Sequence, residues 1–197
     1  MGTRLVLASA SPRRRALLAE LGIPFEVMPS DVPETRRPDE SPRGFAQRVA
    51  REKALEVARR RPDAVILAAD TIVVVDTDVL GKPRNRDDAR RMLRTLSGRS
   101  HRVLTAVAVV HGPGAIDECV VESGVEFRHL EPDDIERYLD SGEPFDKAGA
   151  YAVQGLAKQF IVAVRGSHSN VIGLPMDEVT TLLRRHQLVA DGAYRDD

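Results

Sequence analysis

The chain has 197 residues, of which 42% are hydrophobic and 30% charged, a composition typical of a folded protein with a sizeable core. Its 29 Lys and Arg residues and 30 Asp and Glu residues leave a net charge of −1, which argues against a nucleic acid polymer or an anionic membrane as partner. The single Cys119 excludes an intramolecular disulfide framework. Because no signal peptide and no apolar run of ~18 residues is evident, we expect a cytoplasmic protein.

The first half of the chain predicts alternating strands and helices. Ser11 and Pro12 suit the N-cap and the first position of a helix, and four prolines between 29 and 42 mark a loop. The predicted elements are a strand over 4–8, a helix over 13–21, a strand over 24–28, a loop over 29–43, a helix over 44–61, and two buried strands over 64–69 and 72–75, interrupted by Asp70 and Thr71.

The second half predicts a hairpin flanked by helices. The elements are a turn at 76–78, a helix over 86–96, strands over 101–110 and 119–127 joined by a turn at 112–114, a helix over 132–139, a strand over 159–164, a helix over 175–186, and a tail from about 191. No repeat or linker divides residues 1–197. We therefore expect one elongated α/β domain with a mixed sheet and two lobes flanking a central cleft.

The segment Ser9-Ala10-Ser11-Pro12-Arg13-Arg14 is a candidate anion site. It lies at a predicted strand–loop–helix junction, where backbone N–H groups, hydroxyls and guanidinium groups converge. It has no glycine-rich phosphate loop. An N-cap followed by solvated arginines is the alternative.

Asp70 follows the buried run 64–69, at a place where α/β sheets open ligand crevices. Burying a charge without a partner is costly, so this position favours a metal ligand or a general base. The alternative is a turn that Asp70 caps together with Thr71.

Lysine is rare in this chain: 25 of the 29 basic residues are Arg and four are Lys. Lys53 falls on the apolar stripe of the predicted helix over 44–61, so it must reach water, a carboxylate or a ligand. Lys82 and Lys147 lie in predicted turns, where a lysine is usually solvated. A polyphosphate with a divalent metal would account for lysines, arginines, serines and carboxylates in one place.

Several short segments, taken in order, resemble the Maf family. They are Leu7-Ala8-Ser9-Ala10-Ser11-Pro12-Arg13-Arg14, Ala69-Asp70-Thr71-Ile72-Val73, Gly81-Lys82-Pro83, Leu96-Ser97-Gly98, Asp146-Lys147-Ala148-Gly149-Ala150-Tyr151 and Gln154-Gly155. The resemblance implies a nucleoside triphosphate pyrophosphatase that works with Mg²⁺ or Mn²⁺ in a cleft of an elongated α/β fold.

The resemblance also implies roles for single residues. Asp70 would be the general base, and Glu34 and Asp70 would be metal ligands. The phosphates would be held by Ser9, Arg14, Lys53 and Lys82.

Three further positions separate two branches of the family. Arg13, Thr71 and Gln154 match the branch that acts on dTTP and UTP, whereas the branch that acts on 7-methyl-GTP has Trp, Gln and Glu there. A nucleotide-sensing regulator of septum formation and a broader clean-up of modified nucleotides are the alternative functions. The sequence leaves open whether the chain forms a homodimer.

Overall fold

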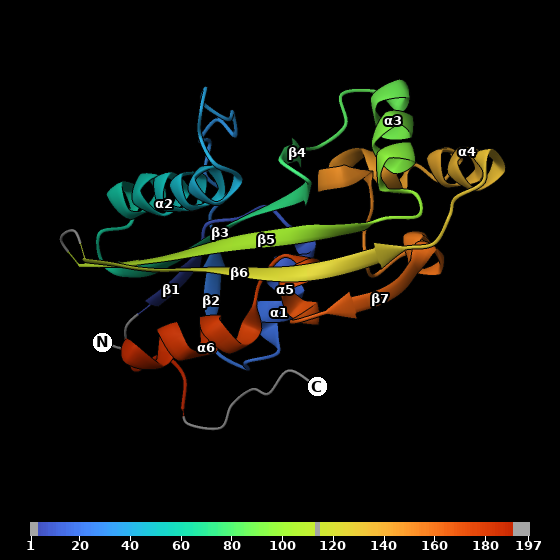
Figure 1. The fold of residues 1–197 in the computed structure, drawn as a ribbon. Helices are drawn as coiled ribbons and strands as arrows, with labels where there is room; N and C mark the ends of the chain where they lie inside the picture. Colours follow the sequence, from blue (N-terminus) through green and yellow to red (C-terminus); the bar gives the residue numbers. More distant parts are fainter. Residues whose placement is uncertain (1–3, 113–114, 191–197) are drawn as a thin grey trace.

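A seven-stranded mixed sheet forms the centre of the computed structural model, which describes residues 4–112 and 115–190 (Figure 1). The strand order is β2-β1-β3-β5-β6-β7, with β4 paired to β3. Strands β2, β1 and β3 are parallel, and all other pairs are antiparallel. The bounds are β1 Arg4–Leu7, β2 Phe25–Val27, β3 Ala64–Val75, β4 Asp78–Leu80, β5 Ser100–His111, β6 Ala115–Phe127 and β7 Ile161–Arg165.

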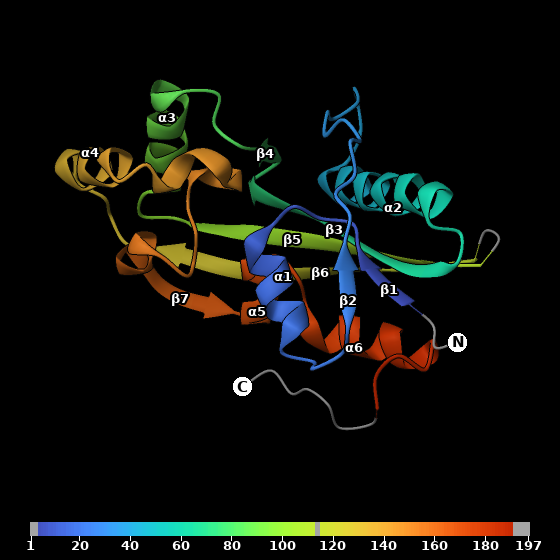
Figure 2. The same ribbon diagram turned by 180° about the vertical axis from the view of Figure 1, so that it is seen from behind.

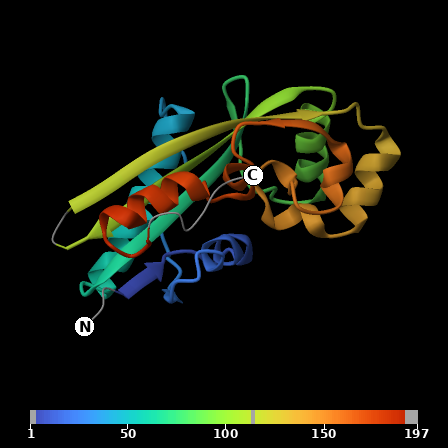
Figure 3. The same ribbon diagram turned by 90° about the horizontal axis from the view of Figure 1, so that it is seen from below.

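Helices cover both faces of this sheet. Helix α2 lies on one face, and α1, α5 and α6 lie on the other (Figures 1 and 2). Helices α3 and α4 pack together at the end of the sheet where β5 begins and β6 ends (Figure 3). The bounds are α1 Pro12–Ala19, α2 Pro42–Arg60, α3 Arg86–Leu96, α4 Pro132–Asp140, α5 His168–Ile172 and α6 Met176–Arg185, with short 3₁₀ segments η1 Glu143–Asp146, η2 Ala148–Ala150 and η3 Leu156–Phe160.

The alternation of side chains along β3 divides the core into two layers. Ile66, Ala68 and Ile72 pack under α2, whereas Leu67 and Val73 belong to the larger core on the opposite face. Within the described ranges, no helix combines the length and the apolar character needed to cross a bilayer.

The predicted α/β class with a mixed sheet is confirmed, and most predicted elements lie within a few residues of the observed ones. The long helix begins at Pro42 rather than at 44, because the Ser41 hydroxyl accepts a hydrogen bond from the Gly44 amide and caps it. The tail from 191 and part of the turn at 112–114 lie outside the described residues.

The prediction of two strands interrupted at Asp70 and Thr71 is wrong. Strand β3 runs unbroken from Ala64 to Val75, because β5 pairs with it continuously from Ile66 to Val74. The short strand β4 and helix α5 were not predicted, since three to five residues carry too little periodicity to indicate an element.

Candidate active site

An open stretch of one edge of β3 positions the candidate site. Strand β1 pairs with this edge as far as Leu67, and β4 pairs with it again from Val73. Asp70 lies midway between them, beyond the carboxyl end of β1. The crevice therefore opens at the end of β1, while Asp70 itself is held rigidly in the middle of a strand.

A cleft of about 430 Å³ opens at this gap. Its volume is within the range of small-molecule sites. Every site residue predicted from the sequence lines it: Ser9, Arg13, Arg14, Glu34, Lys53, Asp70, Thr71, Lys82 and Gln154. These residues come from the β1–α1 loop, α1, the β2–α2 loop, α2, β3, the segment after β4 and the segment after η2.

Lys53 joins two carboxylates on the α2 side of the cleft. Its Nζ lies 2.8 Å from Asp70 Oδ1 and 2.6 Å from Glu34 Oε1. Lys53 and Asp70 are both buried, whereas 44% of the Glu34 side chain is exposed. The prediction that Lys53 faces inward is confirmed, and the carboxylates supply the partners that a buried ammonium needs.

The surroundings of the two carboxyl groups differ, and so do their pKa values. Burial raises the pKa of Asp70, although the neighbouring Lys53 ammonium acts in the opposite direction. Burial also opposes ionisation of Glu34, but Lys53 and Lys82 outweigh it and lower the pKa of that carboxyl group. Asp70 is thus the stronger proton acceptor of the pair once ionised.

Arg14 is held on the other side of β3. Its Nε donates to the Gly173 carbonyl at 2.8 Å, and its two terminal nitrogens donate to Thr71 Oγ1 at 2.9 Å and Ser9 Oγ at 3.3 Å. Burial lowers the pKa of Arg14, partly offset by Asp70 and Glu34, yet a guanidinium stays protonated in proteins. The protein therefore presents an oriented cation with two N–H donors left for a ligand.

Thr71 acts as a link within this arrangement. Besides Arg14, its hydroxyl contacts Thr105 Oγ1 at 3.0 Å, and Thr105 donates to the carbonyl of Asn170. Gly173 has φ of +122°, and a side chain there would meet Thr71 Oγ1 at 3.3 Å. A glycine is therefore needed for the backbone carbonyl to approach Arg14 and Thr71 closely.

A second close approach of backbone, at Gly149, shapes the part of the cleft next to Val73. Gly149 has φ of +67°, a Cβ atom there would lie 3.0 Å from Val73, and its amide donates to the Gly81 carbonyl. The next residue, Ala150, also has a positive φ of 59°, a backbone conformation that costs an L-residue roughly 1–2 kcal/mol. This strained turn directs Tyr151 into the lining of the cleft.

Tyr151 and its partner His101 were not singled out as site residues from the sequence. Tyr151 Oη lies 2.7 Å from His101 Nε2, and both side chains are buried. Burial lowers the pKa of His101 to about 4, so the imidazole is neutral near pH 7. The signal in the sequence was a histidine within the apolar strand over 101–110, which needs a polar partner.

Lys147, for which no site role was predicted, also lines the cleft. Its ammonium donates to the Glu143 carbonyl at 2.7 Å and to the Asp146 carboxylate, so it is tied to its own loop. Three of the predicted site residues are more exposed and lie nearer the mouth of the cleft. Arg13 is half-buried, Gln154 is exposed, and 62% of the Lys82 side chain is exposed, with Nζ 4.0 Å from Glu34 Oε2.

The cleft therefore brings together two carboxylates, several fixed or flexible cations and a buried, rigid floor. Carboxylate oxygens are the protein ligands that Mg²⁺ accepts, usually together with phosphate oxygens. Glu34 and Asp70 approach a common cation, the Lys53 ammonium, so their placement fits a shared divalent ion. This chemistry suits an anionic, phosphate-bearing ligand.

Sequence comparison assigns the chain to a family. The profile of the family described as Maf-like protein matches residues 4–186. The chain belongs to this family. The most similar relatives of this Maf-like protein include one from Anaeromyxobacter dehalogenans strain 2CP-1, 54% identical over 188 residues, and one from Hahella chejuensis, 50% identical over 184 residues. Both are named dTTP/UTP pyrophosphatase; the alignments cover 94% and 92% of this chain and 95% and 91% of the relatives.

Among solved structures, the Ham1 protein of Staphylococcus aureus matches with a TM-score of 0.56 and 13% identity, covering 93% of this chain and all of the other. At this identity the match bears on the fold alone, and it agrees with the mixed-sheet architecture of this Maf-like protein.

Proposed function

We propose that this Maf-like protein hydrolyses dTTP and UTP in the cleft, giving the nucleoside monophosphate and pyrophosphate. The buried contact between Lys53 and Asp70 carries the proposal, because a protein that only bound polyanions would gain nothing from a buried carboxylate in the binding site. The names of relatives about 50% identical along nearly the whole chain support the choice of substrate.

Asp70 is the general base in this proposal. Its carboxylate is fixed by β3 and by Lys53 at 2.8 Å, so it can accept a proton from a water molecule that attacks phosphorus. Lys53 favours the ionised form of Asp70 and so opposes the effect of burial on its pKa. Donating to both Asp70 and Glu34, it also fixes the distance between the two carboxylates.

Cations of the cleft would offset the charge of the triphosphate. Arg14 is oriented by three hydrogen bonds before substrate arrives, so little reorganisation is needed when charge develops on the phosphates. Lys82 and Arg13, at the mouth, are free to follow the phosphate oxygens. Ser9 supports Arg14 through its hydroxyl oxygen.

Glu34 and Asp70 would hold a Mg²⁺ or Mn²⁺ ion that arrives with the substrate. When bound, this ion would supply further neutralisation of the phosphate charge. For Glu34 to bind this ion, its contact with Lys53 must weaken. The Glu34 side chain is 44% exposed, so it has room to move.

Gln154 would read the base. Its amide offers both a donor and an acceptor, which matches the edge of uracil or thymine. Because Gln154 is exposed and lines the cleft, its side chain is accessible to a ligand. Glutamate there would instead suit a base that presents donors and positive charge.

A nucleotide screen tests the proposal. Purified protein is incubated with each canonical and selected modified nucleoside triphosphate, with Mg²⁺ or Mn²⁺, and pyrophosphate is measured. We expect the highest kcat/KM with dTTP and UTP. Binding without pyrophosphate release would favour the nucleotide sensor, and a preference for modified nucleotides would favour the clean-up function.

A further inference from the structure

A second group of metal-ligating side chains lies far from the cleft, at the other end of the long strands. His111 ends β5, Asp117 lies near the start of β6, and His186 directly follows α6. One ligand atom from each lies within 4.8 Å of the other two. His111 is five residues along β5 from Ala106, the strand partner of Asp70, roughly 17 Å at about 3.3 Å per residue.

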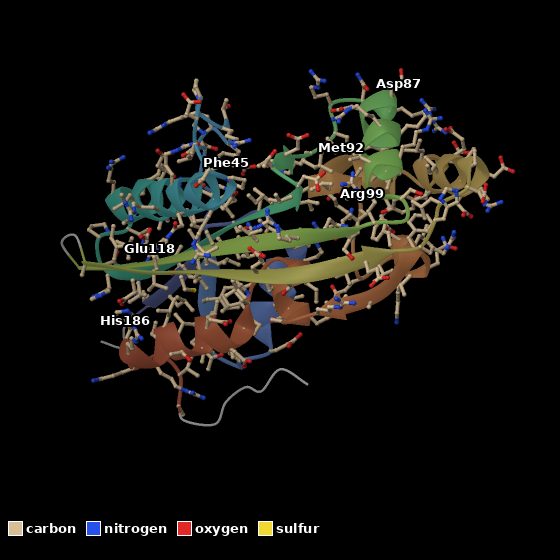
Figure 4. The ribbon with its side chains drawn as sticks, viewed as in Figure 1. Phe45, Asp87, Met92, Arg99, Glu118 and His186 are labelled. Atoms are coloured by element: carbon tan, nitrogen blue, oxygen red, sulfur yellow. The ribbon has the colours of Figure 1, made fainter. Side chains whose placement is uncertain are left out.

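The fold brings these three residues to one face of the sheet. His111 pairs with Ala115 and Val109 pairs with Asp117, so His111 and Asp117 are diagonal neighbours on the same face of the β5–β6 hairpin. Val109 belongs to the core that α6 covers, whereas Glu118 points to the opposite face and pairs with Arg51 of α2. Figure 4 shows His186 and Glu118 on opposite sides of the hairpin.

The distances are close to those of a coordination site. His186 Nε2 lies 3.0 Å and His111 Nε2 lies 3.7 Å from the same oxygen, Asp117 Oδ2. Neighbouring ligand atoms in a tetrahedral site lie about 3.4 Å apart when each bond is about 2.1 Å long. The two imidazole rings lie against each other, with centroids 3.9 Å apart and planes inclined at 48°.

Burial and charge favour a bound cation here over a simple ion pair. The three side chains are 10–37% exposed, so they are constrained by the fold yet open to solution. His186 caps the C-terminal end of α6, where the helix dipole attracts positive charge. Arg185 is a competing cation, because its Nη1 lies 3.7 Å from Asp117 Oδ1. However, 61% of its side chain is exposed, and it approaches the carboxylate oxygen that the two imidazoles do not contact.

We propose that His111, Asp117 and His186 form a binding site for a transition-metal ion of the Zn²⁺ class, which ties the β5–β6 hairpin to the end of α6. Two imidazoles and one carboxylate suit Zn²⁺, Ni²⁺ or Cu²⁺, whereas Mg²⁺ prefers oxygen ligands only. Three protein ligands leave a position for water.

Calorimetry with Zn²⁺ tests the site in the tag-free full chain. The titration is made in a Glu34→Gln, Asp70→Asn background, in which the cleft carboxylates no longer compete. We expect one Zn²⁺ per chain, unaffected by equimolar Mg²⁺. His111→Gln, His186→Gln and Asp117→Asn should each weaken binding by at least about tenfold, the loss that follows removal of even an outer partner of a metal site.

His129→Gln is the matched control, because His129 also has a carboxylate neighbour, Glu131, at 3.8 Å, but lies outside the cluster. It should leave Zn²⁺ affinity unchanged. Absence of stoichiometric binding, displacement by Mg²⁺, or unchanged affinity in the three cluster variants would overturn the proposal.

A measurement on the wild-type chain avoids any effect of substitutions on folding. Histidine modification by diethyl pyrocarbonate is followed residue by residue by mass spectrometry, with and without Zn²⁺. The proposal predicts that Zn²⁺ protects His111 and His186 but not His129. Equal modification of His111 and His186 under both conditions contradicts it.

Discussion

The two faces of β3 meet the cleft with different chemistry, although Asp70 and Thr71 are adjacent. On the α2 face, Asp70 joins the charged group of Lys53 and Glu34. On the opposite face, Thr71 belongs to a chain of hydroxyls and carbonyls that orients Arg14. The carboxylates and the ammonium on the first face can exchange protons, whereas the groups on the second face fix the position of the Arg14 guanidinium. Because consecutive residues of a strand point to opposite faces, the reactive group on Asp70 and the positioning group on Thr71 are one residue apart yet separated by the sheet.

Asp70→Asn should have the largest effect on turnover. The amide keeps the size of the side chain but cannot accept the proton, so we expect kcat to fall roughly 10²- to 10⁴-fold with the fold retained. Asp78→Asn, at an exposed carboxylate of β4, is the control and should leave kcat unchanged. Near-normal turnover of dTTP by Asp70→Asn would remove Asp70 from the mechanism.

Lys53→Met should have the largest effect on stability. It leaves Asp70 buried without its partner, which should lower the free energy of unfolding by about 3–5 kcal/mol near pH 7. Lys158→Met, at an exposed lysine of η3, should be nearly neutral. Urea denaturation of both variants measures the difference, and equal stability would show that Asp70 does not depend on Lys53.

The same variant gives a pH test. Burial raises the pKa of folded Asp70 above its unfolded value, so its contribution to stability is greatest when it is protonated and is lost as the pH rises through the folded pKa. Removal of Lys53 should raise this pKa further. The deficit of Lys53→Met should therefore shrink as the pH is lowered from 7.5 to 5; a deficit independent of pH would point to lost packing instead.

Thr71→Val tests the other face and should have a smaller effect. Valine keeps the shape but leaves Arg14 Nη2 without its acceptor and removes the contact with Thr105, which keeps its bond to the Asn170 carbonyl; we expect a loss of about 1–3 kcal/mol. KM for dTTP should rise with it, since Arg14 is less well oriented. Thr77→Val, in the exposed turn before β4, is the control, and matching behaviour of the two variants would argue against the positioning role of Thr71.

Gln154→Glu should change selectivity with little effect on stability. The residue is exposed, so the free energy of unfolding should stay within about 0.5 kcal/mol of wild type. The ratio of kcat/KM for dTTP and UTP to that for 7-methyl-GTP should fall, whereas Gln159→Glu, also exposed, should leave it unchanged. An unchanged ratio in Gln154→Glu would mean that the base is read elsewhere.

The groups on the two faces of β3 were not equally predictable from the sequence. A 3.6-residue period placed Lys53 on the buried stripe of its helix, and the apolar run before Asp70 placed that carboxylate inside the fold, so their meeting was foreseeable. The continuity of β3 was not, because two polar residues inside an apolar run resemble a turn unless the cleft they face is known. The role of Thr71 was hidden for the same reason: its partners lie 34 to 102 residues away in the chain.

The contacts of individual side chains also explain the other differences from the sequence predictions. Lys147 stood out in the sequence, yet it bonds to its own loop. His111, Asp117 and His186 gave no signal, since strand pairing brings the first two together and only the packing of α6 adds the third. Periodicity predicts which face a side chain takes, but it does not predict which remote group it meets there.

Analysis of the products formed from dTTP is the most direct test of the account. Wild-type protein with Mg²⁺ should release dTMP and pyrophosphate in equal amounts, and Asp70→Asn should bind dTTP while releasing both roughly 10²- to 10⁴-fold more slowly. Release of dTDP and orthophosphate, or tight binding of dTTP by the wild-type chain without turnover, would contradict it.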